Sequence, residues 1–421
     1  MQSEITTLAN GLRVITSSRP EIETVSLGIW IKTGSAFETE EMNGISHFLE
    51  HMVFKGTPTR TSFQIDAEIE DAGGQTNAYT SREITSFYAK MLKDDAELAL
   101  DVLADIVLNA SFPDEEVVKE RDVVIQEIKQ TIDTPDDIIF DYLQQQAYTG
   151  QPLGRPILGS IEKVSGFTAD DLRKYRKRFY VAENICVCAV GNIEHEKFVD
   201  MVKKRFSNLP QHLDSEFPTQ KYVGGYYAEQ RDIKQAHVLI GFEGVSYHDD
   251  DYYPAAVLSA ILGGGSTSRL FQEIREKRGL VYTVYSFINA HRSSGLMGIY
   301  AGTTRKELQE LIPVVTAEIN KIRTAPVLPE ELKRAKVQFK ASMLMGLESS
   351  STTSEIYARQ MLVFGRIIPT EEMTAKIDAI TAEDITKIAN RIFASKPVYT
   401  LVGDIDGHPD YDELRRLLEQ R

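Results

Sequence analysis

Short runs of apolar and β-branched residues in the N-terminal third of the chain, alternating with polar residues in some of them, are typical of β-strands. These runs predict strands over 6–8, 13–16, 25–31, 76–80 and 85–89. Asn10-Gly11 lies between the first two, and this dipeptide favours a β-hairpin. Elsewhere, apolar residues recur at the spacing of an amphipathic helix, which predicts helices over 44–54, 62–72, 95–109, 114–131 and 136–147. The mixture of the two periods indicates an α+β fold.

Two stretches of the first half recur in the second half. The segment 167–172 (Phe-Thr-Ala-Asp-Asp-Leu) returns at 380–385 (Ile-Thr-Ala-Glu-Asp-Ile), and 190–193 (Val-Gly-Asn-Ile) returns at 402–405 (Val-Gly-Asp-Ile). In both copies a helix leads into a strand and then into a second helix, at an offset of 212 to 213 residues. Because the offset is about half of the 421 residues, the sequence predicts two copies of one domain, related by internal duplication.

The predicted helix over 44–54 carries the most specific chemical motif. His47 and His51 are four residues apart, so both imidazoles project from one face and can share a metal ion, usually zinc. Glu50 lies between them on the same side, close enough to activate a water on such an ion. The order H-x-x-E-H is the inverse of the commoner H-E-x-x-H motif, which is found on the zinc-binding helix of many proteases. A histidine at an apolar boundary is often simply packed, but two histidines with a glutamate at this spacing favour a metal site.

A third metal ligand is expected from another helix, because catalytic zinc usually has three protein ligands and one position for water. In the helix over 114–131, Glu116, Glu120 and Glu127 fall on one face at spacings of four and seven. The same pattern also suits a solvated acidic face. Spacing alone does not decide between Glu120 and Glu127.

The two repeats differ in their candidate chemistry. The stretch 253–261 matches the metal helix in position but has no histidine or glutamate, so one metal site per chain is expected. We expect two α/β-sandwich domains, each an antiparallel-rich sheet flanked by helices. The N-terminal metal-binding catalytic domain covers 1–213, a polar, proline-containing linker covers 214–225, and the homologous domain without metal ligands covers 226–421.

Composition narrows the function classes. The net charge of −15 argues against nucleic-acid binding as the main task and favours basic substrates, although acidic surfaces also serve solubility. No apolar run is long enough for a membrane span, and no secretory signal is visible at the N-terminus. Cys186 and Cys188 share one face of a predicted strand, where a disulfide between them is unfavourable. They are interpreted as core residues of a reduced, cytoplasmic protein.

The segment 47–57 (His-Phe-Leu-Glu-His-Met-Val-Phe-Lys-Gly-Thr) resembles the signature of the inverzincin zinc metallopeptidases. This family includes pitrilysin, insulin-degrading enzyme and mitochondrial processing peptidase. The resemblance spans essentially the whole chain, and it is greatest to the processing-peptidase branch and its bacterial relatives, whose chains have about this length. Pitrilysin-type chains are about twice as long and carry four such domains.

The resemblance assigns roles to the motif residues. The family's third ligand is a glutamate some 76 residues beyond the second histidine, which implies that His47, His51 and Glu127 hold Zn²⁺. Glu120 is also matched and is expected to orient the ligands from behind. Glu50 is expected to be the general base that deprotonates the zinc-bound water.

The resemblance also implies residues that bind substrate in the N-terminal domain. Asn77, Ala78 and Tyr79 resemble an edge strand that pairs with the peptide backbone by β-addition; without the resemblance they suit an ordinary sheet strand. Phe54 matches a position that forms an apolar pocket after the scissile bond. The substrate is therefore expected to be bound in an extended conformation.

Four more residues match the family at greater distances from the motif. Asp137 and Asp141 match acids that hold an arginine near the cleavage site in the processing-peptidase branch; surface charge is the alternative. Arg275 and Tyr282 follow a glycine-rich loop at 263–265, which lacks the Gly-Lys-Ser/Thr of a nucleotide-binding loop. They match a pair that contacts substrate near the reacting carbonyl. In double-length relatives this pair comes from the half without zinc, so it is expected to serve a partner's site in a homodimer.

The predicted function is that of a zinc-dependent endopeptidase hydrolysing peptides or presequence-like unfolded segments in an enclosed chamber. Two alternatives share the fold: a non-catalytic core or scaffold subunit, and one subunit of a heterodimeric processing peptidase. The complete set of metal-binding residues argues against the scaffold. Because Arg275 and Tyr282 occur in the same chain as the metal motif, an enzyme made of this chain alone is favoured over the heterodimer.

Overall fold

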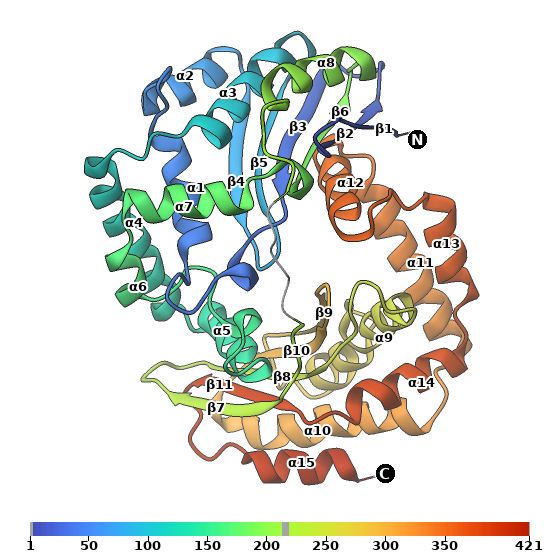
Figure 1. Cartoon of the computed structure of the whole chain (residues 1–421). Helices are drawn as coiled ribbons and strands as arrows, with labels where there is room; N and C mark the ends of the chain where they lie inside the picture. The colour runs from blue at the N-terminus through green and yellow to red at the C-terminus, as the bar shows by residue number, and fades with distance from the viewer. Residues whose placement is uncertain (1–2, 213–218, 421) are drawn as a thin grey trace. The chain divides into compact units, whose positions relative to one another are not determined.

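A computed structural model describes residues 3–212 and 219–420, which form two compact units (Figure 1). The first unit contains 3–129, 155–212 and Leu344–Ile368; the second contains Gln130–Gly154, Thr219–Met343 and 369–420. Each unit has one β-sheet with helices packed on it. The units are therefore not two consecutive halves, because each contains one segment from the other half of the sequence.

The first sheet has six strands among the described residues, in the order β1-β2-β6-β3-β5-β4. Their bounds are Glu4–Thr7 (β1), Arg13–Ser18 (β2), Thr24–Ile31 (β3), Gln75–Thr80 (β4), Thr85–Leu92 (β5) and Ile185–Gly191 (β6). β6 is parallel to β2, and the other neighbours are antiparallel. The five strands predicted in the N-terminal third are confirmed, including the hairpin of β1 and β2. β4 lies at the edge of the sheet.

Helices cover both faces of this sheet. The unit contains α1 (Ile45–Met52), α2 (Ser62–Asp71), α3 (Ala96–Asn109), α4 (Asp114–Asp133, whose end falls in the second unit), α6 (Ile161–Gly166), α7 (Ala169–Phe179), α8 (His195–Phe206) and α12 (Ser350–Phe364). α3 and α8 pack on one face, and α12 packs on the other against β2, β3 and β6 (Figure 1). The predicted helices from 44 to 131 are confirmed.

The alternation of side chains along β6 explains the two cores of the first unit. Val187 and Ala189 belong to the large core, whereas Cys186 and Cys188 belong to a smaller core that includes residues of α12. Both thiols are buried and unpaired. Their assignment as core residues is confirmed, and the cytoplasmic location inferred from them stays a prediction.

The second sheet has five strands among the described residues, in the order β7-β11-β8-β10-β9. They are Gly225–Gln230 (β7), Ala236–Glu243 (β8), Thr283–Ala290 (β9), Gly295–Thr303 (β10) and Val398–Gly403 (β11). The helices are α5 (Pro135–Ala147), α9 (Tyr252–Gly263), α10 (Arg305–Thr324), α11 (Pro329–Gly346, whose end falls in the first unit), α13 (Thr370–Ala379), α14 (Ala382–Phe393) and α15 (Tyr411–Glu419). None of the described helices is both long and apolar enough to cross a membrane.

The two units repeat one topology, as the duplicated sequence predicts. β2-β6-β3-β5-β4 corresponds to β7-β11-β8-β10-β9, and in each sheet a single neighbouring pair is parallel, β6 with β2 and β11 with β7. The repeated segments form α7, β6 and α8 in one copy and α14, β11 and α15 in the other. The fold class is therefore confirmed.

Each unit takes one helix from the other half of the sequence. α5 packs on the second sheet, and α12 packs on the first. The domain bounds at 213 and 226 describe the repeat in the sequence and stay a prediction. Part of the proposed linker over 214–225 lies outside the described residues.

Candidate metal centre

A buried carboxylate holds the start of the motif helix α1. Glu38 Oε2 accepts a hydrogen bond from the Gly44 amide at 2.8 Å, and Oε1 accepts one from the Ser46 amide at 2.8 Å. These amides would otherwise lack partners at the helix N-terminus. Gly44 has φ 100°, and a Cβ there would lie 2.8 Å from the Cα of Gly159, so only glycine fits. The role of Glu38 was not predicted, because this residue lies outside the spacing of a capping box.

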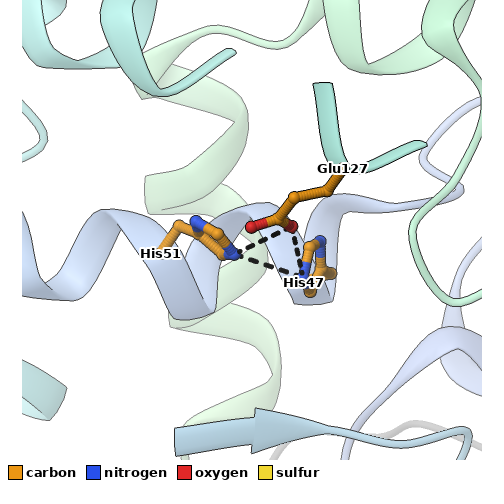
Figure 2. Close-up of side chains that lie close together, drawn as sticks. All are labelled: His47, His51 and Glu127. Carbon is orange, nitrogen blue, oxygen red and sulfur yellow. Dashed lines mark hydrogen bonds and ion pairs between the residues drawn. The ribbon is translucent and has the colours of Figure 1, made fainter. Parts of the chain in front are cut away.

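Three side chains from two helices meet beside α1. His47 and His51 lie one turn apart on this helix, and Glu127 reaches them from α4 (Figure 2). The two Nε2 atoms are 3.2 Å apart, and Glu127 Oε2 is 3.6 Å from that of His47 and 3.5 Å from that of His51. These three residues, predicted as ligands, form the one group of potential metal-binding side chains found in the described part of the chain. Their role as ligands stays a prediction.

The separations between these atoms suit a tetrahedral zinc site. Ligand atoms about 2.0–2.1 Å from zinc at tetrahedral angles lie about 3.3 Å from one another. The observed separations of 3.2, 3.5 and 3.6 Å are close to that value. Two unprotonated imidazole nitrogens at such a distance repel each other unless a proton or a cation lies between them. The donor set therefore fits zinc.

Charges around the imidazoles also favour a cation. Burial, together with the charge of His51, lowers the pKa of His47 to about 3, so this imidazole is neutral. Burial also lowers the pKa of His51, but the hydrogen bond to Glu120 and the charges of Glu127 and Glu50 outweigh it and raise the net pKa. The surroundings of His51 thus stabilise positive charge, which a metal ion supplies when it replaces the proton.

Glu120 lies behind the cluster, and its predicted role in orienting a ligand stays a prediction. Its side chain is buried, with Oε1 2.8 Å from Nδ1 of His51 and Oε2 2.6 Å from Nζ of Lys55. This contact leaves Nε2 of His51 directed at the cluster. Burial raises the pKa of Glu120, but the hydrogen bonds from His51 and Lys55 outweigh it, so the carboxylate is ionised. Lys55 was missed as a supporting residue, although it lies in the recognised segment.

Glu50 is held by the edge strand. Its Oε2 accepts a hydrogen bond from the Thr80 hydroxyl at 2.6 Å, which leaves Oε1 available for another proton. Burial raises the pKa of Glu50, while the Thr80 hydrogen bond and the charge of His51 lower it in part, so the net pKa is above the ordinary value. A raised pKa suits a group that takes and returns a proton. Thr80 was missed, because no local pattern distinguishes it from other strand threonines.

The predicted substrate strand is β4, an edge strand with β5 as its neighbour in the described sheet. The Ala78 amide donates to Oδ1 of its neighbour Asn77 at 2.8 Å, so this amide points away from β5. Because alternate residues of an antiparallel strand point the same way, the backbone groups of Thr76 and Thr80 also face outward. Tyr79 extends to the opposite face from Thr80, and its hydroxyl donates to Glu355.

Phe54 lies directly after α1, in a short 3-10 turn over Val53–Lys55. Its side chain is half-buried against the large core of the first unit. The centroid of its ring is 6.3 Å from the centroid of the Phe87 ring. Its predicted part in an apolar substrate pocket stays a prediction.

The other predicted substrate residues belong to the second unit. Asp137 and Asp141 lie on α5. Arg275 lies in a π-helical segment, Phe271–Glu276, with its guanidinium 4.8 Å from the centroid of Phe271, and Tyr282 is 62% exposed. The helix α9, at the place of the metal helix in the repeat, has no histidine or glutamate. The roles of these four residues stay predictions.

Two protein-family models match the chain. Residues 13–161 match the model described as insulinase (peptidase family M16), and residues 166–339 match the model described as the peptidase M16 inactive domain. The first match contains the candidate ligands, and the second ends within the half that lacks them.

Relatives and solved structures cover nearly the whole chain. A protein of Rickettsia felis named an uncharacterized zinc protease is 41% identical over 96% of this chain and 98% of its own length. A protein of Arabidopsis thaliana named a probable mitochondrial-processing peptidase subunit beta is 36% identical over 99% of this chain and 81% of its own. A protease structure from Helicobacter pylori has a TM-score of 0.90 at 23% identity, covering 96% of this chain and 99% of that one.

Proposed function

The chain belongs to peptidase family M16, and on this basis we propose that it is a zinc-dependent endopeptidase that hydrolyses peptides or presequence-like unfolded segments in an enclosed chamber. The observation that carries the proposal is the convergence of His47, His51 and Glu127, with Glu50 on the same helix as the two histidines. Zinc-protease names among the relatives support the same chemistry.

The residues around the cluster each supply a part of peptide hydrolysis. His47, His51 and Glu127 would hold the zinc, which would lower the pKa of a water molecule and polarise the scissile carbonyl. Glu50 takes the proton of the attacking water at Oε1 and delivers it to the leaving amine. The Thr80 hydroxyl donates a hydrogen bond to Oε2 of Glu50, and this bond fixes the orientation of the carboxylate.

The edge strand β4 supplies a binding surface for extended peptides. Outward-facing backbone groups of Thr76, Ala78 and Thr80 pair with the substrate backbone as an additional strand. The side chain of Asn77, which now accepts from the Ala78 amide, is displaced when a substrate carbonyl takes its place. Phe54, beside α1, provides apolar contact for the residue after the cleaved bond.

Peptide cleavage with and without a chelator tests this function. We expect the purified chain to cleave unfolded peptides from a mixed library, to lose turnover when its metal is removed, and to regain it with added zinc. Mass spectrometry of the products measures cleavage. Cleavage that persists unchanged in the fully metal-depleted protein would refute the proposal.

Two other assignments use the same fold. A scaffold subunit needs no metal, so bound zinc and cleavage by the purified chain decide against it. A heterodimeric peptidase is favoured by one observation, namely that the Arabidopsis thaliana relative is named a subunit beta. We propose a homodimer instead, in which Arg275 and Tyr282 serve the partner's site, because one chain carries both this pair and the metal motif.

Mixed dimers test the sharing of residues between chains. Glu50→Gln and Arg275→Ala chains are each expected to be inactive or nearly so as homodimers. After random exchange, one site in four combines an intact Glu50 with an intact Arg275 from the partner, so about a quarter of wild-type activity returns.

The mixture needs two controls. Arg278 lies two residues after the π-helical segment and pairs with Glu273. The variant Arg278→Ala is expected to stay near wild-type activity. Formation of mixed dimers is confirmed by differently tagged chains. Confirmed mixed dimers without recovered activity would count against shared sites.

A further inference from the structure

One carboxylate connects α12 to two strands of the first sheet. Glu355 Oε2 accepts a hydrogen bond from the Trp30 indole N–H on β3 at 2.6 Å, and Oε1 accepts one from the Tyr79 hydroxyl on β4 at 2.5 Å. Arg359 Nε, one turn further along α12, is 3.8 Å from Oε1. Trp30 is 1% exposed, so its indole N–H has no access to water as a substitute partner. Glu355 thus ties a helix from the second half of the sequence to the strand proposed to bind substrate.

The edge strand β4 packs against α1 and α2 and has a single neighbouring strand among the described residues. In the described sheet it pairs with β5 on one side, and its outer side carries the backbone groups proposed to bind substrate. A neutral donor bonded to a carboxylate forms a stronger hydrogen bond than two neutral groups do. Burial and the charge of Glu355 raise the pKa of Tyr79, so its hydroxyl stays a donor. The Tyr79–Glu355 bond therefore restrains β4 from the face opposite α1.

The restraint reaches Glu50 through one peptide unit. Successive strand residues point to opposite faces, so Tyr79 extends toward α12 while the adjacent Thr80 extends toward α1. There the Thr80 hydroxyl donates to Glu50. A shift of Tyr79 consequently moves both the outward backbone groups of β4 and the hydroxyl that orients Glu50.

We propose that Glu355 is a positioning residue for this site, which acts through Tyr79 to hold β4 in register for substrate and to hold Thr80 against Glu50. The inference rests on the proposed peptidase function, and it adds a residue that lies 305 positions along the chain from Glu50. Glu355 itself contacts neither the candidate metal ligands nor the outer side of β4.

The experiment compares Glu355→Ala, Tyr79→Phe and the double variant in the full-length, zinc-loaded protein. Each single variant is expected to raise KM for a cleaved peptide about tenfold, the effect of losing one hydrogen bond to a charged group, with a smaller change in kcat. The double variant is expected to match the worse single variant, since both remove the same contact. Bound zinc is expected to stay at the wild-type level in all three.

Ser351→Ala is the matched control. Ser351 lies on α12 one turn before Glu355, and its hydroxyl is 2.9 Å from that of Ser26 on β3, so the contact joins the same helix to the sheet without reaching β4. This variant is expected to keep KM within about twofold of wild type. If KM rises as much in Ser351→Ala as in Glu355→Ala, any lost contact between α12 and the sheet has the same effect. This result would overturn the proposal.

Hydrogen exchange of the segment 75–80 gives a readout that does not depend on cleavage. Exchange is expected to accelerate about tenfold in Glu355→Ala and Tyr79→Phe and to stay unchanged in Ser351→Ala. If wild type cleaves no peptide, the peptidase function fails, and the exchange rates still decide whether Glu355 holds β4. Unchanged exchange in both Glu355→Ala and Tyr79→Phe overturns the positioning role.

Discussion

Replacing Glu50 by glutamine is expected to lower kcat about a thousandfold while the protein keeps its zinc. Glutamine preserves the volume of the side chain and still accepts the Thr80 hydrogen bond through its amide oxygen, so the geometry of α1 and β4 is retained. It has no basic atom to take the proton of the attacking water. Because Glu50 is absent from the cluster of candidate ligands, its loss removes chemistry and leaves the metal site intact.

Steady-state kinetics and metal analysis of the same preparation check this prediction. Thr80→Val serves as the graded control, since it leaves the Glu50 carboxylate in place and removes only the hydroxyl that orients it. We expect a smaller loss of kcat in Thr80→Val than in Glu50→Gln. Undiminished turnover by Glu50→Gln would remove Glu50 from the mechanism.

Replacing Glu127 by alanine is expected to weaken zinc binding by more than the tenfold to hundredfold typical of losing a residue that supports a ligand. In the structure Glu127 Oε2 faces the Nε2 atoms of both imidazoles, whereas Glu120 contacts one of the two imidazoles, at Nδ1 of His51. Activity is expected to fall with the bound metal. Competition with a chelator of known affinity measures the change.

Three glutamates of α4 form a matched series for this measurement. Glu127→Ala is expected to weaken zinc binding most, Glu120→Ala by about tenfold to hundredfold, and Glu116→Ala not at all. Glu116 lies one turn before Glu120 and pairs with Lys119 instead of an imidazole, so it controls for lost charge. A larger loss of zinc in Glu120→Ala than in Glu127→Ala would reverse the assignment.

The elements that the sequence predicts correctly are those set by local patterns. α1 follows from its apolar spacing, the β1–β2 hairpin from Asn10-Gly11, and the repeated topology from segments 212 to 213 residues apart. The two histidines of the motif meet because their spacing on one helix brings them together. Glu127 is different, since it comes from another helix, and because Glu120 lies on the same face, the placement of α4 along its own axis decides which of the two faces the cluster.

Contacts that follow no regular spacing along the chain leave no pattern in the sequence. Glu38 supports α1 from a loop, Thr80 supports Glu50 from a strand, and Glu355 reaches β4 from the second half of the chain. For the same reason, the sequence does not show that α5 packs on the second sheet and α12 on the first. An amphipathic pattern shows that a helix buries one face, but it does not show which sheet covers that face.

The amount of zinc held by the native, unmodified chain tests the central claim most directly. Elemental analysis after purification without added metal, followed by titration of the stripped protein, measures both stoichiometry and affinity. The account predicts one zinc per chain, because the repeat retains the ligands in one copy only. A native, folded chain that binds no divalent ion at His47, His51 and Glu127 would contradict it.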